Sequence, residues 1–205
     1  MKKIITNDES ETFFNEEFNE TYHSITGAVE ESIKKFILPA ISKKVDGKKI
    51  KILDICFGLG YNSGCAIDYF EDCEITGIEI DEDIIKKINE VNPNFKSYNE
   101  IKELINKKQT KHIKLIIGDA LIEIKKLENN YFDIVFLDPF SPKKAPELWT
   151  EEFIKNIYSK MKKWGVLTTY SCASIVRKNL KNAGFCIENG PKVGRRGPST
   201  VAVKC

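Results

Sequence analysis

The run from Lys51 to Asn62 constrains the fold of this chain more than any other feature. Its first half, Lys51 to Cys56, is mostly apolar and predicts a buried β-strand that ends in an acidic residue, Asp54. Gly58 and Gly60 follow, and glycine both accepts backbone angles closed to other residues and lets a ligand approach the main chain. A helical pattern begins at Asn62, so the turn presents free backbone N–H groups at a helix N-terminus. A strand, a glycine turn and a helix in this order predict a nucleotide-type cofactor site.

The type of cofactor depends on what the glycine turn lacks. A dinucleotide or P-loop site needs a third glycine or a Gly-Lys-Ser/Thr ending, and no lysine precedes Ser63. The pattern D-x-x-F-G-x-G instead resembles the first motif of class I S-adenosylmethionine (SAM) methyltransferases, and an ordinary strand-to-helix turn is the alternative. The candidate cofactor-binding residues of this motif are Asp54, Phe57, Gly58, Gly60 and Asn62.

Length and composition narrow the class of protein. At 205 residues the chain is expected to form one domain with a sizeable core. It has neither an apolar run long enough to cross a bilayer nor a signal-peptide pattern at its start, so we expect a cytoplasmic protein. The six cysteines (56, 65, 73, 172, 186 and 205) form no C-x-x-C pair. They predict reduced thiols and no metal site.

Charge is distributed unevenly along the chain. The net charge is +2, but residues 1–142 carry 19 Lys and Arg against 26 Asp and Glu, whereas residues 143–205 carry 13 against 4. A basic C-terminal third is a possible footprint of a nucleic-acid partner. Lysine is common throughout this chain, so solvated helix faces explain the same asymmetry.

Alternating strand and helix patterns from residue 50 onward predict an α/β fold with a mostly parallel seven-stranded sheet. The predicted strands are Ile50–Cys56, Glu74–Ile80, Ile113–Gly118, Phe132–Leu137, Gly165–Ser171, Phe185–Glu188 and Thr200–Lys204. The predicted helices are Asn62–Phe70, Asp83–Val91, Tyr98–Lys108, Leu121–Lys126, Glu151–Lys163 and Ala173–Ala183. The last two strands are joined by a loop too short for a helical crossover, which predicts a C-terminal antiparallel hairpin. This is the layout of the class I, Rossmann-like methyltransferase fold.

Residues 1–49 are expected to form an N-terminal extension packed on the domain of residues 50–205. The spacing of aromatic residues between Glu11 and His23 predicts a small hairpin. An amphipathic helix is predicted from Ala28 to Ile41, stopped near Pro39 and by Asp46-Gly47.

Acidic residues follow two more predicted strands. Glu79 ends the second strand about 20 residues after the glycine turn, where a carboxylate can accept the hydroxyls of a ribose. Asp81 is better placed to cap the next helix. Asp119 ends the third strand, where it can accept a hydrogen bond from an adenine amino group while Ala120 leaves room for the ring; a helix cap is the alternative for Asp119. Ligands bind at this edge of open α/β sheets, so these residues join the cofactor site.

The run from Phe136 to Trp149 is the most unusual stretch of the chain. A buried strand delivers Asp138 at its tip, and three prolines stiffen the loop that follows. A carboxylate beside an amine can accept the proton that the amine must lose before it is methylated, and Phe140 and Trp149 could stack on a planar base. Alternatively, Asp138 caps the turn and the aromatic residues fill the core.

With these motifs, most of the chain resembles the tRNA 5-aminomethyl-(2-thio)uridine methyltransferases, the family formed by the methyltransferase half of MnmC and its stand-alone relatives. The most specific part is Phe136–Trp149. The other matching parts are Phe18–Ser24, Gly27–Glu31, Ile52–Asn62, Ser171–Arg177, Leu180, Ala183–Phe185 and Gly194–Arg196.

The resemblance implies that the protein transfers a methyl group from SAM to the aminomethyl group of a tRNA wobble uridine. It implies that Asp138 is the catalytic carboxylate and that Phe140 and Trp149 shape the base pocket. The implied partner is the anticodon stem-loop of tRNA, and the candidate phosphate contacts are Lys143, Lys144, Arg177, Arg195 and Arg196. Neither a metal nor a membrane is expected, and the protein is expected to be a monomer or a homodimer.

The sequence departs from the family at three positions. Cys56 stands where the family's turn usually has glycine, Leu59 where threonine is frequent, and Pro139 where glycine is frequent. We expect no fused oxidase domain, so the aminomethyl substrate is expected to come from another route.

Two other functions fit parts of the sequence. A polyamine synthase or small-molecule methyltransferase uses the same cofactor edge but usually needs an acidic loop after the fourth strand, and here that loop is basic. A protein of this fold that only binds RNA is the third possibility. The sequence leaves two roles open for Tyr22, His23 and Glu31, which either line the cofactor mouth or pack the N-terminal extension.

Overall fold

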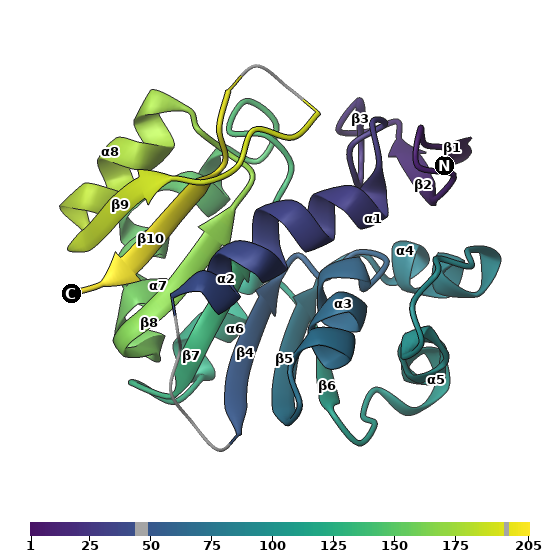
Figure 1. Cartoon of the computed structure of the whole chain (residues 1–205), viewed down its shortest axis with the longest axis horizontal. Coiled ribbons are helices and arrows are strands. Elements are labelled where there is room, and N and C mark those ends of the chain that lie inside the picture. The colour runs from purple at the N-terminus through teal and green to yellow at the C-terminus, as the bar shows by residue number, and fades with distance from the viewer. Residues whose placement is uncertain (44–48, 195–196) are drawn as a thin grey trace.

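A computed structural model describes residues 1–43, 49–194 and 197–205. Its centre is a seven-stranded sheet with the order β6-β5-β4-β7-β8-β10-β9, drawn in Figure 1. The strands are β4 (Ile50–Ile55), β5 (Cys73–Glu79), β6 (Ile113–Ile117), β7 (Phe132–Leu137), β8 (Met161–Thr169), β9 (Phe185–Asn189) and β10 (Thr200–Lys204). The first five pair in parallel, and β10 pairs antiparallel with both β8 and β9. The predicted α/β fold with its C-terminal antiparallel hairpin is confirmed.

Helices cover both faces of the sheet because successive side chains of a strand point to opposite faces. Ile52 of β4 belongs to a core under α3, α4, α5 and the helix of residues 28–42, whereas Leu53 belongs to a core under α6, α7 and α8. The helices are α3 (Tyr61–Tyr69), α4 (Glu82–Lys87), α5 (Tyr98–Lys107), α6 (Ala120–Lys126), α7 (Glu151–Lys160) and α8 (Ser174–Asn182), with short 3₁₀ turns at Ile88–Glu90 and Pro146–Trp149. Because β7 is covered on both faces, all of its residues except Asp133 are apolar, whereas β4 carries two charged residues, Lys51 and Asp54.

The first 42 residues form a small sheet and one helical segment. The sheet has the order β1-β2-β3, with β1 at Lys2–Ile5, β2 at Glu11–Asn15 and β3 at Glu20–Thr21. The hairpin of β2 and β3 agrees with the sequence prediction, which missed β1. The helical segment follows as α1 (Ala28–Glu31), a π-helical stretch (Ser32–Ile37) and α2 (Leu38–Ser42), and it crosses the sheet in Figure 1. The division of the chain at residue 50 stays a prediction.

Three sequence predictions need correction. The helical segment passes through Pro39, which lies in the first turn of α2, where a missing N–H is tolerated; the predicted stop at Asp46-Gly47 lies outside the described residues. Helix α7 ends at Lys160 rather than Lys163, because the chain enters β8 at Met161. Cys186 and Cys205 form a disulfide, so the prediction that all cysteines are reduced was wrong for this pair.

In the described part of the chain, no helix combines the length and the apolar character needed to cross a membrane.

Candidate active site

A cavity of about 620 Å³ opens at the edge where the parallel strands end. One wall comes from the turns after β4, β5, β6 and β7, and the opposite wall comes from the N-terminal segment of residues 18–24 together with Glu31. The carboxyl ends of the strands at a change of strand order are the usual ligand site of open α/β sheets. The volume suits a ligand of nucleoside size.

The glycine turn after β4 forms the floor of this cavity. Gly58 lines it and donates its N–H to Glu79 Oε2 at 2.8 Å. Cys56 also lines it, with a φ of 64°, which explains why this position favours glycine in related turns. Burial raises the pKa of the Cys56 thiol well above its usual value, so the thiol is neutral.

The other predicted residues of the turn do not line the cavity. Asp54 is fully buried and accepts the hydroxyl of Ser63 at 2.6 Å. Phe57 fills the space beside two glycines, since a Cβ on Gly60 or Gly77 would come within 2.7 Å and 2.6 Å of its ring. These residues support the turn from below, and a cofactor-binding role for Asp54, Phe57 and Gly60 stays a prediction.

Glu79 ends β5 as predicted, and its carboxylate lines the cavity. Besides the Gly58 bond, Glu79 Oε1 accepts the backbone N–H groups of Ile80 and Asp81, both at 2.9 Å. Burial raises the pKa of Glu79, although the backbone hydrogen bonds lower it. One lone pair of Oε2 remains for a further donor, because a carboxylate offers about four acceptor sites. Asp81 caps α4 by accepting the N–H groups of Asp83 and Ile84, as the sequence predicts.

Asp119 and Ala120 also line the cavity, at the end of β6. Asp119 Oδ1 caps α6 by accepting the Leu121 N–H at 2.8 Å. The cap fixes the side chain at the mouth of the cavity, so capping and ligand binding are compatible roles. Ala120 is buried and leaves the space beside Asp119 open.

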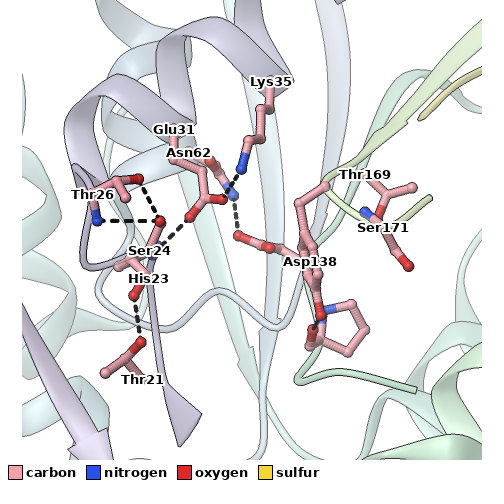
Figure 2. A network of polar contacts seen from close by, with 12 residues as sticks. Thr21, His23, Ser24, Thr26, Glu31, Lys35, Asn62, Asp138, Thr169 and Ser171 are labelled. Atoms are coloured by element: carbon pink, nitrogen blue, oxygen red, sulfur yellow. Dashed lines mark hydrogen bonds and ion pairs between the residues drawn. The ribbon is translucent and has the colours of Figure 1, made fainter. Parts of the chain in front are cut away.

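Asp138 stands immediately after β7 and lines the same cavity. Its Oδ2 accepts the Asn62 amide at 2.9 Å, as Figure 2 shows. Asn62 is buried and outside the lining and holds Asp138, and its predicted contact with a cofactor stays a prediction. Burial raises the pKa of Asp138 well above its usual value, and the nearby carboxylate of Glu31 raises it further. A carboxyl group with a raised pKa is suited to accept a proton near neutral pH.

The loop after Asp138 is fixed from two sides. Trp149 is buried in the core and donates its indole N–H to the carbonyl of Phe140 at 2.8 Å. It therefore holds the loop from below and does not line the cavity, contrary to the stacking role predicted for it. Phe140 does line the cavity, and its ring stacks on Phe18 at a centroid distance of 4.5 Å.

Sequence reasoning left the N-terminal residues undecided, and the structure places Tyr22, His23 and Glu31 in the cavity lining. Tyr22 donates its hydroxyl to Asp81 across the cavity mouth. His23 stacks on Tyr61 at 4.8 Å, and burial lowers its pKa to about 4, so it is neutral. The available signal was that Tyr22 and His23 lie in Phe18–Ser24 and Glu31 ends Gly27–Glu31, two runs that resemble the family.

The lining is acidic. It includes seven carboxylates: Glu20, Glu31, Glu79, Asp81, Asp119, Asp138 and Glu147. No lysine or arginine of the described residues lines the cavity. Such a wall attracts cations, and both a sulfonium cofactor and an ammonium group are cations.

Of the predicted basic residues, the three that the structure describes do not line the cavity. Lys143 and Lys144 are exposed on the loop after Asp138. Arg177 is engaged within the protein, since it donates to Thr200 Oγ1 at 3.0 Å and to the Ser199 carbonyl at 3.2 Å. Arg195 and Arg196 lie outside the described residues. Within the described ranges no cluster of His, Cys, Asp and Glu is arranged to hold a metal ion.

Fold and site together define a SAM-dependent methyltransferase, and comparison with protein families agrees. Residues 82–205 match the model of a family described as S-adenosyl-L-methionine-dependent methyltransferase. The chain belongs to this family, and its cofactor is SAM.

The chain is similar to two proteins over nearly its whole length. The crystal structure of MnmC2 from Aquifex aeolicus matches with a TM-score of 0.81 and 34% identity, over 98% of this chain and 69% of that one. An uncharacterized protein of Methanocaldococcus jannaschii, MJ0670, is 36% identical over 98% of this chain and 59% of its own length.

A shorter match links the chain to a bifunctional enzyme. The tRNA 5-methylaminomethyl-2-thiouridine biosynthesis bifunctional protein MnmC of Leptospira interrogans is 38% identical over 42% of this chain. The chain spans 13% of that protein's length. A spermidine synthase structure shares the fold, with a TM-score of 0.69 and 15% identity.

Proposed function

We propose that this protein is a SAM-dependent N-methyltransferase that methylates the aminomethyl group of 5-aminomethyl-(2-thio)uridine at the wobble position of tRNA. The observation that carries the proposal is Asp138. Its carboxylate is held by Asn62 inside the cavity that also contains Gly58, Glu79 and Asp119. A proton acceptor thus stands in the same cavity as the elements of a nucleoside cofactor site. The similarity to MnmC2 and to MnmC supports the tRNA substrate.

On this proposal the cofactor lies over the glycine turn. Glu79 would accept a ribose hydroxyl through its remaining lone pair, and Asp119 would accept the adenine amino group. Ile80, which is 66% exposed beside Glu79, would contact the adenine face. When bound, SAM supplies an electrophilic methyl group on a sulfonium. The acidic lining would favour this positive charge.

Asp138 would act on the incoming amine. A primary ammonium has no lone pair, so its nitrogen must lose a proton before it can form a bond to carbon. Asp138 would take that proton and become a neutral carboxylic acid. The freed lone pair then forms the N–C bond, the S–C bond breaks with its electron pair going to sulfur, and the product is a secondary ammonium. The raised pKa of Asp138 suits this proton transfer.

The surroundings of the cavity would accommodate an RNA. Phe140 and Phe18 present an aromatic edge to a planar base. Lys143 and Lys144, exposed on the adjacent loop, would contact phosphates. We retain Arg195 and Arg196 as phosphate contacts from the sequence alone. A cytoplasmic location and a monomeric or homodimeric state also stay predictions.

A polyamine is the second candidate substrate, because the acidic lining would favour any polycation. The basic loop at Lys143 and Lys144 favours RNA instead, since these lysines would repel a free polyamine at the entrance. The acidic cavity would therefore accept either substrate, whereas the basic loop at Lys143 and Lys144 would favour only the RNA.

One experiment separates these candidates. The protein is incubated with radiolabelled SAM and with either tRNA that carries 5-aminomethyluridine or a polyamine. We expect label in the tRNA alone, at the wobble nucleoside. Label in the polyamine alone would replace the proposal with the second candidate. Label in neither pool, with SAM binding measured by calorimetry, would leave a SAM-fold RNA-binding protein.

A further inference from the structure

A second carboxylate faces the catalytic one. Glu31, on the N-terminal helical segment, lines the cavity together with Asp138 although the two residues are far apart in the sequence. Figure 2 shows their carboxyl groups pointing toward one another beside Asn62. The two acids come from different segments of the chain, and Glu31 is near enough to Asp138 to act on it electrostatically.

Two donors hold the carboxylate of Glu31 in place. Its Oε1 pairs with Lys35 Nζ at 2.6 Å, and its Oε2 accepts the Ser24 backbone N–H at 2.8 Å. Glu31 lines the cavity but Lys35, which is 1% exposed, does not. The pair therefore presents its negative end to the cavity. Each oxygen has one partner and can accept a second hydrogen bond.

Two buried polar groups around these acids have no partner. Only 6% of the surface of His23 is exposed. Both of its ring nitrogens lack a hydrogen bond. The carbonyl oxygen of the Asn62 amide lacks one as well. Unpaired buried polar groups cost free energy, so they indicate a site that a polar ligand or its water completes.

We propose that Glu31 is a second amine-binding residue and that Glu31 and Asp138 together select a primary amine as the methyl acceptor. The inference rests on the proposed function. A neutral primary amine has two N–H groups and one lone pair. One N–H donated to the Glu31 carboxylate and the other to the carbonyl oxygen of protonated Asp138 leaves the lone pair free to attack the methyl carbon. A hydroxymethyl group has a single donor and would leave one of the two acids unpaired, which is costly in a buried site.

The test compares two RNA stem-loops that differ only in this group. One carries 5-aminomethyluridine and the other 5-hydroxymethyluridine at the wobble position, and both bind the protein loaded with S-adenosylhomocysteine. Wild type is expected to prefer the amine by more than about tenfold, since hydrogen bonds to charged groups are worth a factor of this size or more. Glu31→Gln is expected to lose about tenfold in affinity for the amine and little for the alcohol.

The helix offers a matched control. Glu30 and Lys34 form the same kind of pair, at the same spacing and at 2.5 Å, but outside the cavity lining. Glu30→Gln is therefore expected to bind both stem-loops as wild type does. Because Glu31→Gln leaves the buried Lys35 charge unpaired, the double variant Glu31→Gln with Lys35→Met keeps the test valid if the single variant unfolds.

A second readout comes from the pH dependence of methyl transfer. The charged groups that face Asp138 are Glu31 and Lys35 on the helical segment and Asp54 on β4. Since Glu31 raises the pKa of Asp138 and Lys35 lowers it to a smaller extent, the double variant is expected to move the acid limb of the rate profile to lower pH.

The outcomes are distinguishable. If wild type methylates the amine stem-loop but Glu31→Gln weakens both stem-loops equally, Glu31 is structural and the inference alone is overturned. If wild type neither methylates nor prefers the amine stem-loop, the proposed function fails and the inference falls with it.

Discussion

Asp54 and Asp138 lie at the ends of neighbouring strands, and consecutive residues of α3 hold them. Ser63 donates to Asp54, and Asn62 donates to Asp138. Asp54 is completely enclosed, whereas Asp138 reaches the cavity. The same residue type therefore supports the turn at one strand end and faces the ligand space at the next.

Replacing Asp138 tests its chemical role. We expect Asp138→Ala to lower the rate of methyl transfer by about 10²–10⁴, the range typical of a lost general base. SAM affinity, measured by calorimetry, is expected to stay within a few fold, because the cofactor contacts that we propose lie at Gly58, Glu79 and Asp119. An equal loss of rate and of SAM binding would instead make Asp138 a cofactor ligand or a structural residue.

The buried carboxyl group of Asp54 leads to a prediction about how the free energy of unfolding depends on pH. Burial raises its pKa from 3.8 to about 7. The folded state therefore keeps a proton between these two pH values after the unfolded state has lost it, and the free energy of unfolding falls as pH rises through this window. We expect urea titrations to show this fall in wild type and a smaller one in Asp54→Asn. Identical pH profiles for the two proteins would contradict the raised pKa.

Several site residues could be predicted because their place follows from local pattern. Glu79, Asp119 and Asp138 each follow an apolar strand, and strand ends share one edge of the sheet. Inside the glycine turn the sequence does not tell which side chain points outward. Gly58 faces the cavity and Phe57 faces the core because of the turn's left-handed backbone angles, which three-dimensional packing decides.

At the scale of elements, hydrogen bonds between Glu20 and Ser141, here called the Glu20 latch, tie the N-terminal segment of residues 18–24 to the loop after β7. The carboxylate of Glu20 accepts both the backbone N–H of Ser141, at 2.9 Å, and its hydroxyl. Phe18 and Tyr22 contact the ring of Phe140. Glu20 and Ser141 are 121 residues apart, and a local sequence pattern carries no information about pairing over that distance. This is why the sequence predicted the hairpin of β2 and β3 but not its role in the cavity.

Removing the Glu20 latch should loosen the loop without unfolding the sheet. We expect Glu20→Ala to speed hydrogen exchange at the Ser141 amide, because that N–H loses its acceptor. The Michaelis constant for tRNA is expected to rise as well. Glu16→Ala is the control, since the Glu16 side chain is 78% exposed on the same segment. Equal exchange at Ser141 in both variants would show that Glu20 does not hold the loop.

At the scale of the whole molecule, acidic and basic side chains lie on different parts of the surface. The cavity is lined by carboxylates, while Lys143 and Lys144 are exposed on the adjacent loop. On the proposed function, this arrangement would draw an RNA backbone to the basic C-terminal third and an amine into the acidic cavity. Net charge alone, at +2, hides this arrangement.

Salt dependence measures the basic surface. The double variant Lys143→Ala with Lys144→Ala is expected to bind tRNA more weakly and to reduce the slope of log affinity against log salt by about 2. Arg177→Ala is expected to leave that slope unchanged and to lower the unfolding temperature, because its guanidinium is already bonded to Thr200 and Ser199. A lower slope in Arg177→Ala would place it in the RNA interface after all.

The contact between Glu20 and Ser141 also determines when, during protein synthesis, the cavity can form. Ribosomes add about 5–20 residues per second, so the 121 residues that separate the two partners take roughly ten seconds to make. Throughout that interval Phe18 and Tyr22 have no Phe140 to pack against and stay exposed to chaperones. The cavity closes only after the loop has been translated. On the proposed function, a nascent chain therefore acquires the capacity to hold its substrate only after this loop has been made.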